Sequence, residues 1–184
     1  LNAGNHLLDL INEVLDLAAV ESGNVAMNFQ SIDVVSLIEE MQSLFQPMAN
    51  DYSIRLLMAL DPSLKLVALA DQTRLRQVLL NLVSNAIKYN REDGSVTVAC
   101  KPLNKEKLQI DVIDTGPGIS IENQAKLFDP FNRLGKEYSD VEGTGIGLTV
   151  TKQLVELMGG SIGLVSQLGQ GSHFYIELPI AEQS

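Results

Sequence analysis

Two asparagines and a lysine are the side chains in this sequence that most need a chemical explanation. Asn81, Asn85 and Lys88 are spaced so that a helix places them along one side, about one turn apart. Asparagine is unfavourable inside a helix, because its side chain competes for backbone hydrogen bonds. Both a solvated face of an amphipathic helix and the polar wall of a binding site fit this spacing. Other motifs in the chain are needed to distinguish a solvated face from a binding site.

Glycines gather in three short segments further along the chain, at 116–118, 143–147 and 169–171. Glycine lets the backbone approach a ligand closely or take a positive φ. The segment Gly143-Thr144-Gly145-Ile146-Gly147-Leu148 directly precedes a predicted helix, and backbone N–H groups at a helix start can hold phosphate groups. Each segment alone fits a plain turn. Together with the asparagine helix, they indicate a nucleotide site.

Missing motifs exclude the better-known classes of nucleotide-binding protein. The glycine pattern is not the GxGxxG of dinucleotide-binding folds, and no acidic residue follows it on a second strand at the required distance. The chain has no GxxxxGK[ST] loop, and it lacks the H-R-D and D-F-G signatures of protein kinases.

The segment Asp114-Thr115-Gly116 allows a different function, that of an aspartic protease. Such an enzyme needs two carboxylates that share one proton, and this chain has a single D-T-G, so a homodimer would have to supply the other. Pro117 follows where a small hydroxyl residue or alanine is usual. The protease is therefore a weak alternative, and Asp114 by itself also fits a turn at the end of a strand.

Composition limits the class of partner. The 184 residues carry 23 acidic and 13 basic side chains, a net charge of −10, which leaves no basic surface for nucleic acid. The single cysteine, Cys100, excludes an internal disulfide and lies in a strand-like run, where we expect a buried thiol. No apolar run is long enough to span a membrane. Because the sequence starts inside a helical pattern without a methionine, we expect a piece of a longer protein, with any membrane segment outside it.

The hydrophobic pattern predicts one domain with an N-terminal appendage. Helices are expected at 1–20, 33–50, 71–90, 120–128 and 145–158, and strands at 25–31, 54–60, 65–70, 95–101, 107–114, 161–166 and 172–178. The helix at 71–90 has one apolar face, formed by Leu75, Val78, Leu79, Leu82, Val83, Ala86 and Ile87. Asp33 and Asp71 are placed to cap the helices that follow them. Because helices and strands do not alternate strictly, we predict an α+β fold with helices on one face of a mixed sheet.

Five motifs follow one another between residues 81 and 174. They are the helix segment 81–90, Asp114-x-Gly116-x-Gly118, Phe128-x-Pro130-Phe131-x-Arg133, Gly143-x-Gly145-x-Gly147 and Gly169-x-Gly171-Ser172-x-Phe174. In this order they resemble the ATP-binding domain of sensor histidine kinases, of the ATPase superfamily that includes gyrase B, Hsp90 and MutL. The resemblance covers residues 23–184 and implies a Bergerat-type two-layer α/β sandwich, with a mixed, mostly antiparallel sheet covered on one face by about three helices. Residues 1–22 resemble the second helix of the dimerisation and histidine-phosphotransfer domain.

The resemblance implies which residues meet each end of an ATP molecule. Asn85 would coordinate Mg²⁺ through its side-chain oxygen, and Lys88 would meet the phosphates. Asp114 would accept a hydrogen bond from the adenine amino group, since an ionised carboxylate only accepts and therefore selects an amino purine. Gly116 and Gly118 would let the backbone close over the base.

A lid at residues 132–144 is also implied, with Arg133 in contact with phosphate and the following glycines holding the triphosphate. Phe128 and Phe131 would anchor this loop, and Tyr89 would line the pocket. The full set of implied nucleotide-binding residues is Asn81, Asn85, Lys88, Tyr89, Asp114, Gly116, Gly118, Arg133, Gly143, Thr144, Gly145, Ile146, Gly147 and Leu148.

Asn81 bears on whether ATP is hydrolysed. In the hydrolysing relatives, a glutamate one turn before the metal-binding asparagine activates water. Here that position is Asn81, whose amide cannot act as a general base. The resemblance therefore implies that ATP is held without efficient hydrolysis, which leaves its γ-phosphoryl group for a histidine.

The phosphate-accepting histidine of this family lies on the first dimerisation helix, which we do not find in this sequence. His6 lacks the acidic neighbour of that histidine, and His173 fits a strand residue. The implied parent is a homodimeric, cytoplasmic kinase that passes phosphate to a response regulator receiver domain. Any inner-membrane anchor would lie outside this sequence, which is expected to contact neither membrane nor nucleic acid. A nucleotide-binding regulatory module without transfer and a hydrolysing ATPase of the gyrase kind are the other open functions.

Overall fold

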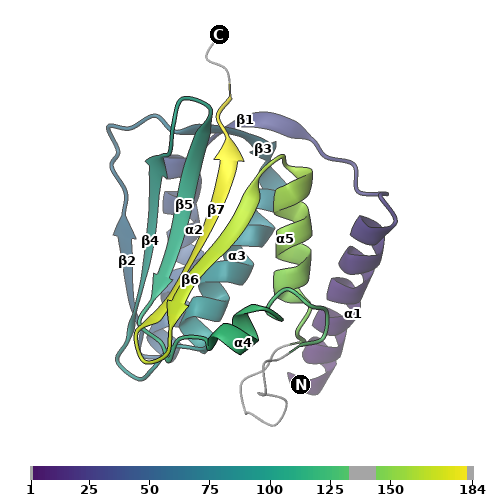
Figure 1. Cartoon of the computed structure of the whole chain (residues 1–184), viewed down its shortest axis with the longest axis vertical. Coiled ribbons are helices and arrows are strands. Elements are labelled where there is room, and N and C mark those ends of the chain that lie inside the picture. Colours follow the sequence, from purple (N-terminus) through teal and green to yellow (C-terminus); the bar gives the residue numbers. More distant parts are fainter. Residues whose placement is uncertain (1, 133–143, 182–184) are drawn as a thin grey trace.

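The computed structural model describes residues 2–132 and 144–181. Within them, a five-stranded sheet is covered on one face by α2, α3 and α5, and a two-stranded sheet lies at one end (Figure 1). The helix α1 packs outside these layers, against α5. The helices are α1 (Asn2–Glu21), α2 (Val34–Asp51), α3 (Gln72–Lys88), α4 (Ile121–Gln124) and α5 (Gly147–Leu157). The strands are β1 (Phe29–Asp33), β2 (Arg55–Ala59), β3 (Val67–Asp71), β4 (Ser95–Pro102), β5 (Lys107–Asp114), β6 (Ser161–Gln167) and β7 (Gly171–Pro179). The predicted α+β sandwich with an N-terminal helix is confirmed.

The main sheet has the strand order β2-β4-β5-β7-β6. β2 runs parallel to β4, and the other neighbours are antiparallel, which includes the two predicted hairpins β4–β5 and β6–β7. Because β7 pairs with β5, the end of β5 lies beside the start of β7, and Asp114 is paired with Ser172. Two segments far apart in the sequence therefore meet at one end of the sheet.

The apolar face of α3 is buried as predicted. Its buried residues are Leu75, Val78, Leu79, Leu82, Val83, Ala86 and Ile87. They belong to the same core as the strand residues Val96, Val98, Ile110 and Val112. Burial of this face fixes the rotation of α3 about its axis, so that the asparagines and the lysine point away from the core.

The cysteine and the length of the apolar helices were both considered from composition. Cys100 is a buried free cysteine, and burial, together with the nearby carboxylates of Asp111 and Asp33, raises the pKa of its thiol to about 11. The thiol is therefore protonated and unreactive at neutral pH. Among the described residues, no helix is long and apolar enough to cross a bilayer.

Three predicted elements differ from the structure. The strand expected at 25–31 is shorter and later in the structure, as β1 (Phe29–Asp33), which pairs with β3 in the small sheet. Alternation of apolar and polar residues predicts an extended segment, but the strand partner decides where pairing begins and ends. The helix expected at 120–128 is reduced to α4, as the chain turns toward Pro130 and Phe131 takes a φ of 62°. The helix expected from residue 145 begins at Gly147, because Gly145 has a φ of 76°.

Asp71 joins two segments at the start of α3. One of its carboxylate oxygens accepts a hydrogen bond from the Arg74 N–H at 3.0 Å, as the predicted N-cap, and the other accepts from the Asn28 N–H at 2.9 Å. Burial raises the pKa of Asp71, but the backbone N–H groups of Asn28, Arg74 and Thr73 outweigh it and leave this pKa below its usual value. The ionised carboxylate therefore stabilises the fold.

We expect Asp71→Ala to lower the free energy of unfolding by about 1–2 kcal/mol at pH 7, because it removes a helix cap and an acceptor for a second N–H group. A carboxylate with a lowered pKa stabilises the fold above its unfolded pKa, and this contribution is lost as pH falls through the folded pKa. The difference from the native chain should therefore shrink below about pH 4 in urea unfolding followed by circular dichroism.

Asp33→Ala is the matched control. Asp33 caps α2 by accepting from the Ser36 N–H at 3.1 Å, and no second segment is joined through it in the described hydrogen bonds. Asp33→Ala should lower the free energy of unfolding by less than Asp71→Ala does. A cost of Asp71→Ala that is the same at pH 7 and pH 3 would contradict the role given to the carboxylate.

Candidate functional site

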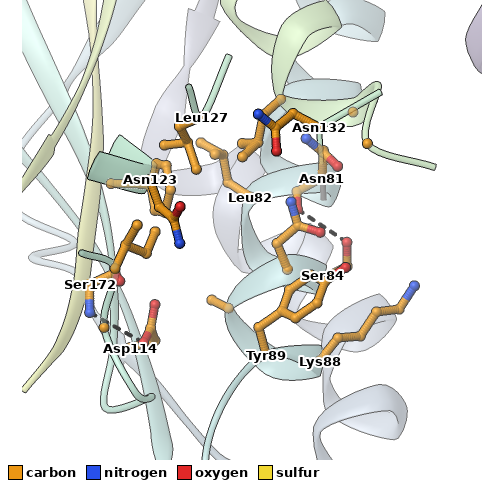
Figure 2. A pocket seen from close by; sticks show the side chains of 18 of the residues that line it. Asn81, Leu82, Ser84, Lys88, Tyr89, Asp114, Asn123, Leu127, Asn132 and Ser172 are labelled. Carbon is orange, nitrogen blue, oxygen red and sulfur yellow. Dashed lines mark hydrogen bonds between the residues drawn. The ribbon is translucent and has the colours of Figure 1, made fainter. Parts of the chain in front are cut away.

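A cavity of about 470 Å³ opens between α3, the loop after β5, α4 and the start of α5 (Figure 2). Cavities of this size hold small-molecule ligands. The predicted site residues that line it are Asn81, Asn85, Lys88, Tyr89, Asp114, Gly118, Thr144, Gly145, Gly147 and Leu148. Gly116 and Ile146 are not part of its wall, and Arg133 and Gly143 lie outside the described residues. These predicted residues come from three of the five motifs, so the structure brings segments that are separate in the sequence to one place.

One wall of the cavity is the second half of the polar stripe on α3. Asn81 donates from Nδ2 to Thr151 Oγ1 of α5 at 2.8 Å. A Cβ atom on Gly147 would lie 2.5 Å from Asn81 Oδ1, so a side chain at 147 would displace the Asn81 amide from this position. Asn85 follows along α3 and lines the same cavity. Lys88 lies one turn further along the helix (Figure 2).

The first half of the same stripe has a different neighbour, the N-terminal helix α1. Gln77 donates to Asp16 of α1 at 2.9 Å, and Arg74 forms an ion pair with Asp16 at 3.7 Å. A second cavity of about 200 Å³ lies here between α1, α3 and α5. The polar stripe, which the sequence presented as one feature, therefore faces α1 over its first half and the larger cavity over its second half.

Asp114 lies at the end of β5 with its carboxylate held by backbone donors. Its Oδ1 accepts from the Gly116 N–H at 2.8 Å and from the Ser172 N–H at 3.3 Å (Figure 2). Gly116 therefore orients Asp114 rather than lining the cavity, and a Cβ atom on Gly116 would lie 2.8 Å from Asp114 Oδ1. This end of the cavity presents a fixed hydrogen-bond acceptor.

The glycine segment before α5 forms another part of the wall. The Ile146 N–H donates to Thr144 Oγ1 at 3.2 Å, while the Ile146 side chain is fully buried in the core. Gly145 accepts from the Phe131 N–H at 3.0 Å. Glu13 of α1 accepts a hydrogen bond from the Thr144 hydroxyl and also lines the cavity. Nothing in the sequence predicts a carboxylate of the first helix at this place.

The two phenylalanines expected to anchor the following loop behave differently. The Phe128 carbonyl accepts from Thr149 Oγ1 at 2.8 Å, and Lys152 Nζ lies 5.4 Å from the centre of the Phe128 ring. Phe131 has a side chain that is 62% exposed. Phe128 contacts α5 through its carbonyl and its ring, whereas Phe131 bonds Gly145 only through its backbone.

Several residues of the cavity wall were not predicted to belong to a binding site. They are Glu13, Leu82, Ser84, Ala86, Pro117, Ile119, Ser120, Asn123, Leu127, Asn132, Leu168, Ser172 and Phe174. Ser172 and Phe174 belong to the last of the five motifs, so the motif marked their place but not their role. The apolar members look like ordinary core residues in the sequence, and nothing in the local pattern distinguishes them.

The donor atoms of the site suit a magnesium ion held mainly by phosphate. Mg²⁺ prefers oxygen ligands and usually keeps water and substrate phosphates around one or two protein oxygens. Among the described residues, no group of three or more His, Cys, Asp or Glu side chains could hold a metal alone. Asn85 has an amide oxygen in the cavity wall, which fits a single protein ligand of this kind.

Comparison with known proteins gives the family. Residues 70–182 match the model of the histidine kinase-, DNA gyrase B- and HSP90-like ATPases. The circadian input-output histidine kinase CikA of Synechococcus elongatus is 38% identical over 97% of this chain, which covers 24% of CikA. The sensor protein GacS of Pseudomonas syringae is 36% identical over 97% of this chain, which covers 20% of GacS. The chain thus spans about a quarter or less of these two relatives.

Solved structures of histidine kinases have the same fold as this chain. Full-length ShkA in complex with AMPPNP superposes with a TM-score of 0.86 at 32% identity, over 100% of this chain and 38% of ShkA. The catalytic domain of the histidine kinase ThkA superposes with a TM-score of 0.72 at 31% identity, over 84% of this chain and 97% of that domain. The protease alternative finds no support in these relatives. The chain therefore belongs to the histidine kinase-, DNA gyrase B- and HSP90-like ATPase family, as its motifs predicted, and matches the catalytic ATP-binding part of sensor histidine kinases.

Proposed function

We propose that the larger cavity binds ATP with Mg²⁺ and presents its γ-phosphoryl group to a histidine of the parent kinase. The observation that carries this proposal is that Asn85 and Asp114 line one cavity of about 470 Å³, although they come from different elements. A metal-binding amide and a base-binding carboxylate are needed at opposite ends of the same nucleotide. Their shared cavity supports that arrangement.

In this proposal the base lies against Asp114, and the triphosphate lies between α3 and the start of α5. The carboxylate of Asp114, held through Oδ1 by two backbone N–H groups, accepts a hydrogen bond from the amino group of adenine. Lys88 and the backbone N–H groups at the start of α5 neutralise the phosphates. Bound Mg²⁺, held by Asn85 and the phosphates, would supply further charge neutralisation to phosphoryl transfer.

Asn81 favours transfer over hydrolysis. Its Nδ2 is committed to Thr151 Oγ1, and an amide cannot take a proton from water. The γ-phosphoryl group is then kept until an acceptor side chain is positioned next to it, because phosphoryl transfer depends mainly on positioning and charge neutralisation.

The proposal also divides the chain. Residues 1–22 are assigned to the dimerisation and phosphotransfer domain, and residues 23–184 to the catalytic domain. Support comes from the apolar side chains on α1 that α5 leaves uncovered, among them Leu8 at 58%, Ile11 at 48% and Leu15 at 61% exposed. Such a stripe suits neighbouring helices of a bundle, as in a homodimeric parent.

A response regulator is the proposed recipient of the phosphate. The histidine kinase ThkA, which resembles this chain at 27% identity with a TM-score of 0.76, has been solved in complex with the response regulator TrrA. Because ATP and such a partner are expected in the cytoplasm, a cytoplasmic location is part of the proposal.

We expect Asn85→Ala to lower the affinity for Mg-ATP by at least about tenfold, because changes at a metal site commonly cost this much. Affinity for ATP in excess EDTA should change little, as measured by titration calorimetry. Gln77→Ala is the control, since Gln77 lies on the same helix but contacts Asp16 of α1. An equal loss of ATP affinity with and without Mg²⁺ would show that Asn85 does not bind the metal.

We expect Asn81→Glu to raise the rate of ATP hydrolysis by at least about tenfold, because a carboxylate at this position can act as a general base. Phosphate release in a coupled assay measures this rate. Asn81→Gln has the same side-chain length without the base and should stay slow. Rapid hydrolysis by the native chain would contradict the proposed retention of the γ-phosphoryl group.

We expect the chain alone to bind ATP without labelling itself. His173 Nε2 lies 2.7 Å from Asp111 Oδ1. Since its neighbour Phe174 lines the cavity, alternation along β7 places His173 on the other face of the sheet. The side chain of His6 lies outside the described residues. Incubation with [γ-³²P]ATP, followed by acid and base treatment, tests for phosphohistidine. Acid-labile label on His6 would show that the assignment of residues 1–22 is wrong.

A further inference from the structure

The β6–β7 hairpin supports the loop that follows Asp114. We call residues 115–120 the base loop, because they lead away from Asp114 along the cavity. The Gly169 N–H donates to the Pro117 carbonyl at 2.8 Å. A Cβ atom on Gly118, which has a φ of 72°, would lie only 2.0 Å from the Gln167 carbonyl oxygen. The base loop therefore rests directly on the hairpin.

Ser166 of β6 lies at the centre of this support, although it is not part of the cavity wall. Its Oγ accepts from the Ile119 N–H at 2.8 Å and lies 2.9 Å from both the Gly171 carbonyl oxygen and Ser172 Oγ. Gln124 adds two bonds from Nε2, to the Ile119 carbonyl at 2.7 Å and to the Ser166 carbonyl at 3.1 Å.

The protons in this cluster can be assigned by counting donors. A serine hydroxyl has one proton, and the Gly171 carbonyl can only accept. Only one arrangement places a proton in every contact of Ser166: its own proton points to Gly171, and the Ser172 proton points to Ser166. If Ser166 instead donated to Ser172, two oxygens would face each other at 2.9 Å without a proton.

This assignment decides what Ser172 offers to a ligand. Ser172 is buried and lines the cavity beside Asp114. With its proton committed to Ser166, its hydroxyl presents only lone pairs on the cavity side. The wall around Asp114 then carries a carboxylate and an accepting hydroxyl (Figure 2). Such a wall suits a base edge or bridging water that donates, and it disfavours a carbonyl oxygen.

We infer that Ser166 is a specificity-determining residue: it orients the hydroxyl of Ser172 as an acceptor and thereby helps the site to prefer a 6-amino purine over a 6-oxo purine. The inference rests on the proposed nucleotide function. Ser166 acts as a positioning residue through Ser172 and Ile119, without touching the ligand itself.

The test compares ATP with inosine triphosphate, which carries a carbonyl oxygen in place of the amino group. Titration calorimetry gives the two dissociation constants and their ratio for each variant. We expect the native chain to prefer ATP by about 100-fold or more, as sites built on hydrogen bonds do. Ser166→Ala should reduce this ratio by about tenfold, because the Ser172 proton becomes free to turn toward the cavity. Ser166→Thr keeps the hydroxyl and should restore the ratio.

Ser161→Ala is the matched control, since Ser161 is an exposed serine on the same strand with its hydroxyl near Glu177. It should leave the ratio unchanged. If Ser166 had only a structural role, Ser166→Ala would weaken the binding of both nucleotides equally and leave the ratio unchanged. An unchanged ratio would overturn the inference, while the proposed function would stand. Failure of the native chain to bind ATP would overturn both.

A double-mutant cycle keeps the test decisive if Ser166→Ala loses stability in urea unfolding. Ser172→Ala should lower the ratio by itself, and adding Ser166→Ala to it should cause no further change in the ratio, because Ser166 acts through Ser172. A ratio that is unaffected by Ser172→Ala would show that this hydroxyl takes no part in base selection.

Discussion

The site depends on how α3 is packed. Burial of one apolar face against the sheet fixes the rotation of this helix, and every polar residue on its other side then has a determined direction. Over its second half, this direction is toward the larger cavity; over its first half, it is toward α1. A helix that rotated by one residue position would bury polar groups in the core at a cost of several kcal/mol, so the positions of Asn81, Asn85 and Lys88 are set by hydrophobic packing.

The opposite side of the cavity depends on strand order. β7 lies between β5 and β6, and the register of these strands places Asp114 beside Ser172 and Ser172 beside Ser166. A Cβ atom on Gly171 would lie 2.0 Å from the Asp114 carbonyl oxygen, so the hairpin reaches this close only with a glycine. Gly171, which does not line the cavity, thus allows the hairpin to approach Asp114. Gly169 contributes differently: it takes a φ of 79° in the turn, and its N–H donates to the Pro117 carbonyl of the base loop.

α1 is coupled to the site through specific polar contacts. Glu13 accepts from the Thr144 hydroxyl at the edge of the larger cavity, and Asp16 contacts Arg74 and Gln77 on α3. The carboxylate of Glu13 lies beside the region proposed for the triphosphate. Both groups are negatively charged, so they repel each other. The position of α1 and the charge at this end of the cavity are therefore physically linked.

The sequence determined the helix faces, the caps at Asp33 and Asp71, the two hairpins and the five motifs, because each of these depends on residues close together in the chain. It also identified half of the polar residues that line the larger cavity. Only the tertiary structure decided that β1 pairs with β3, that the polar stripe is shared between the cavity and α1, that Ser166 contacts the base loop, and that Glu13 lines the cavity. These features depend on strand order and helix docking, which arise from contacts between distant segments. Local periodicity carries no information about them, since one alternating strand or one amphipathic helix can pack against many partners.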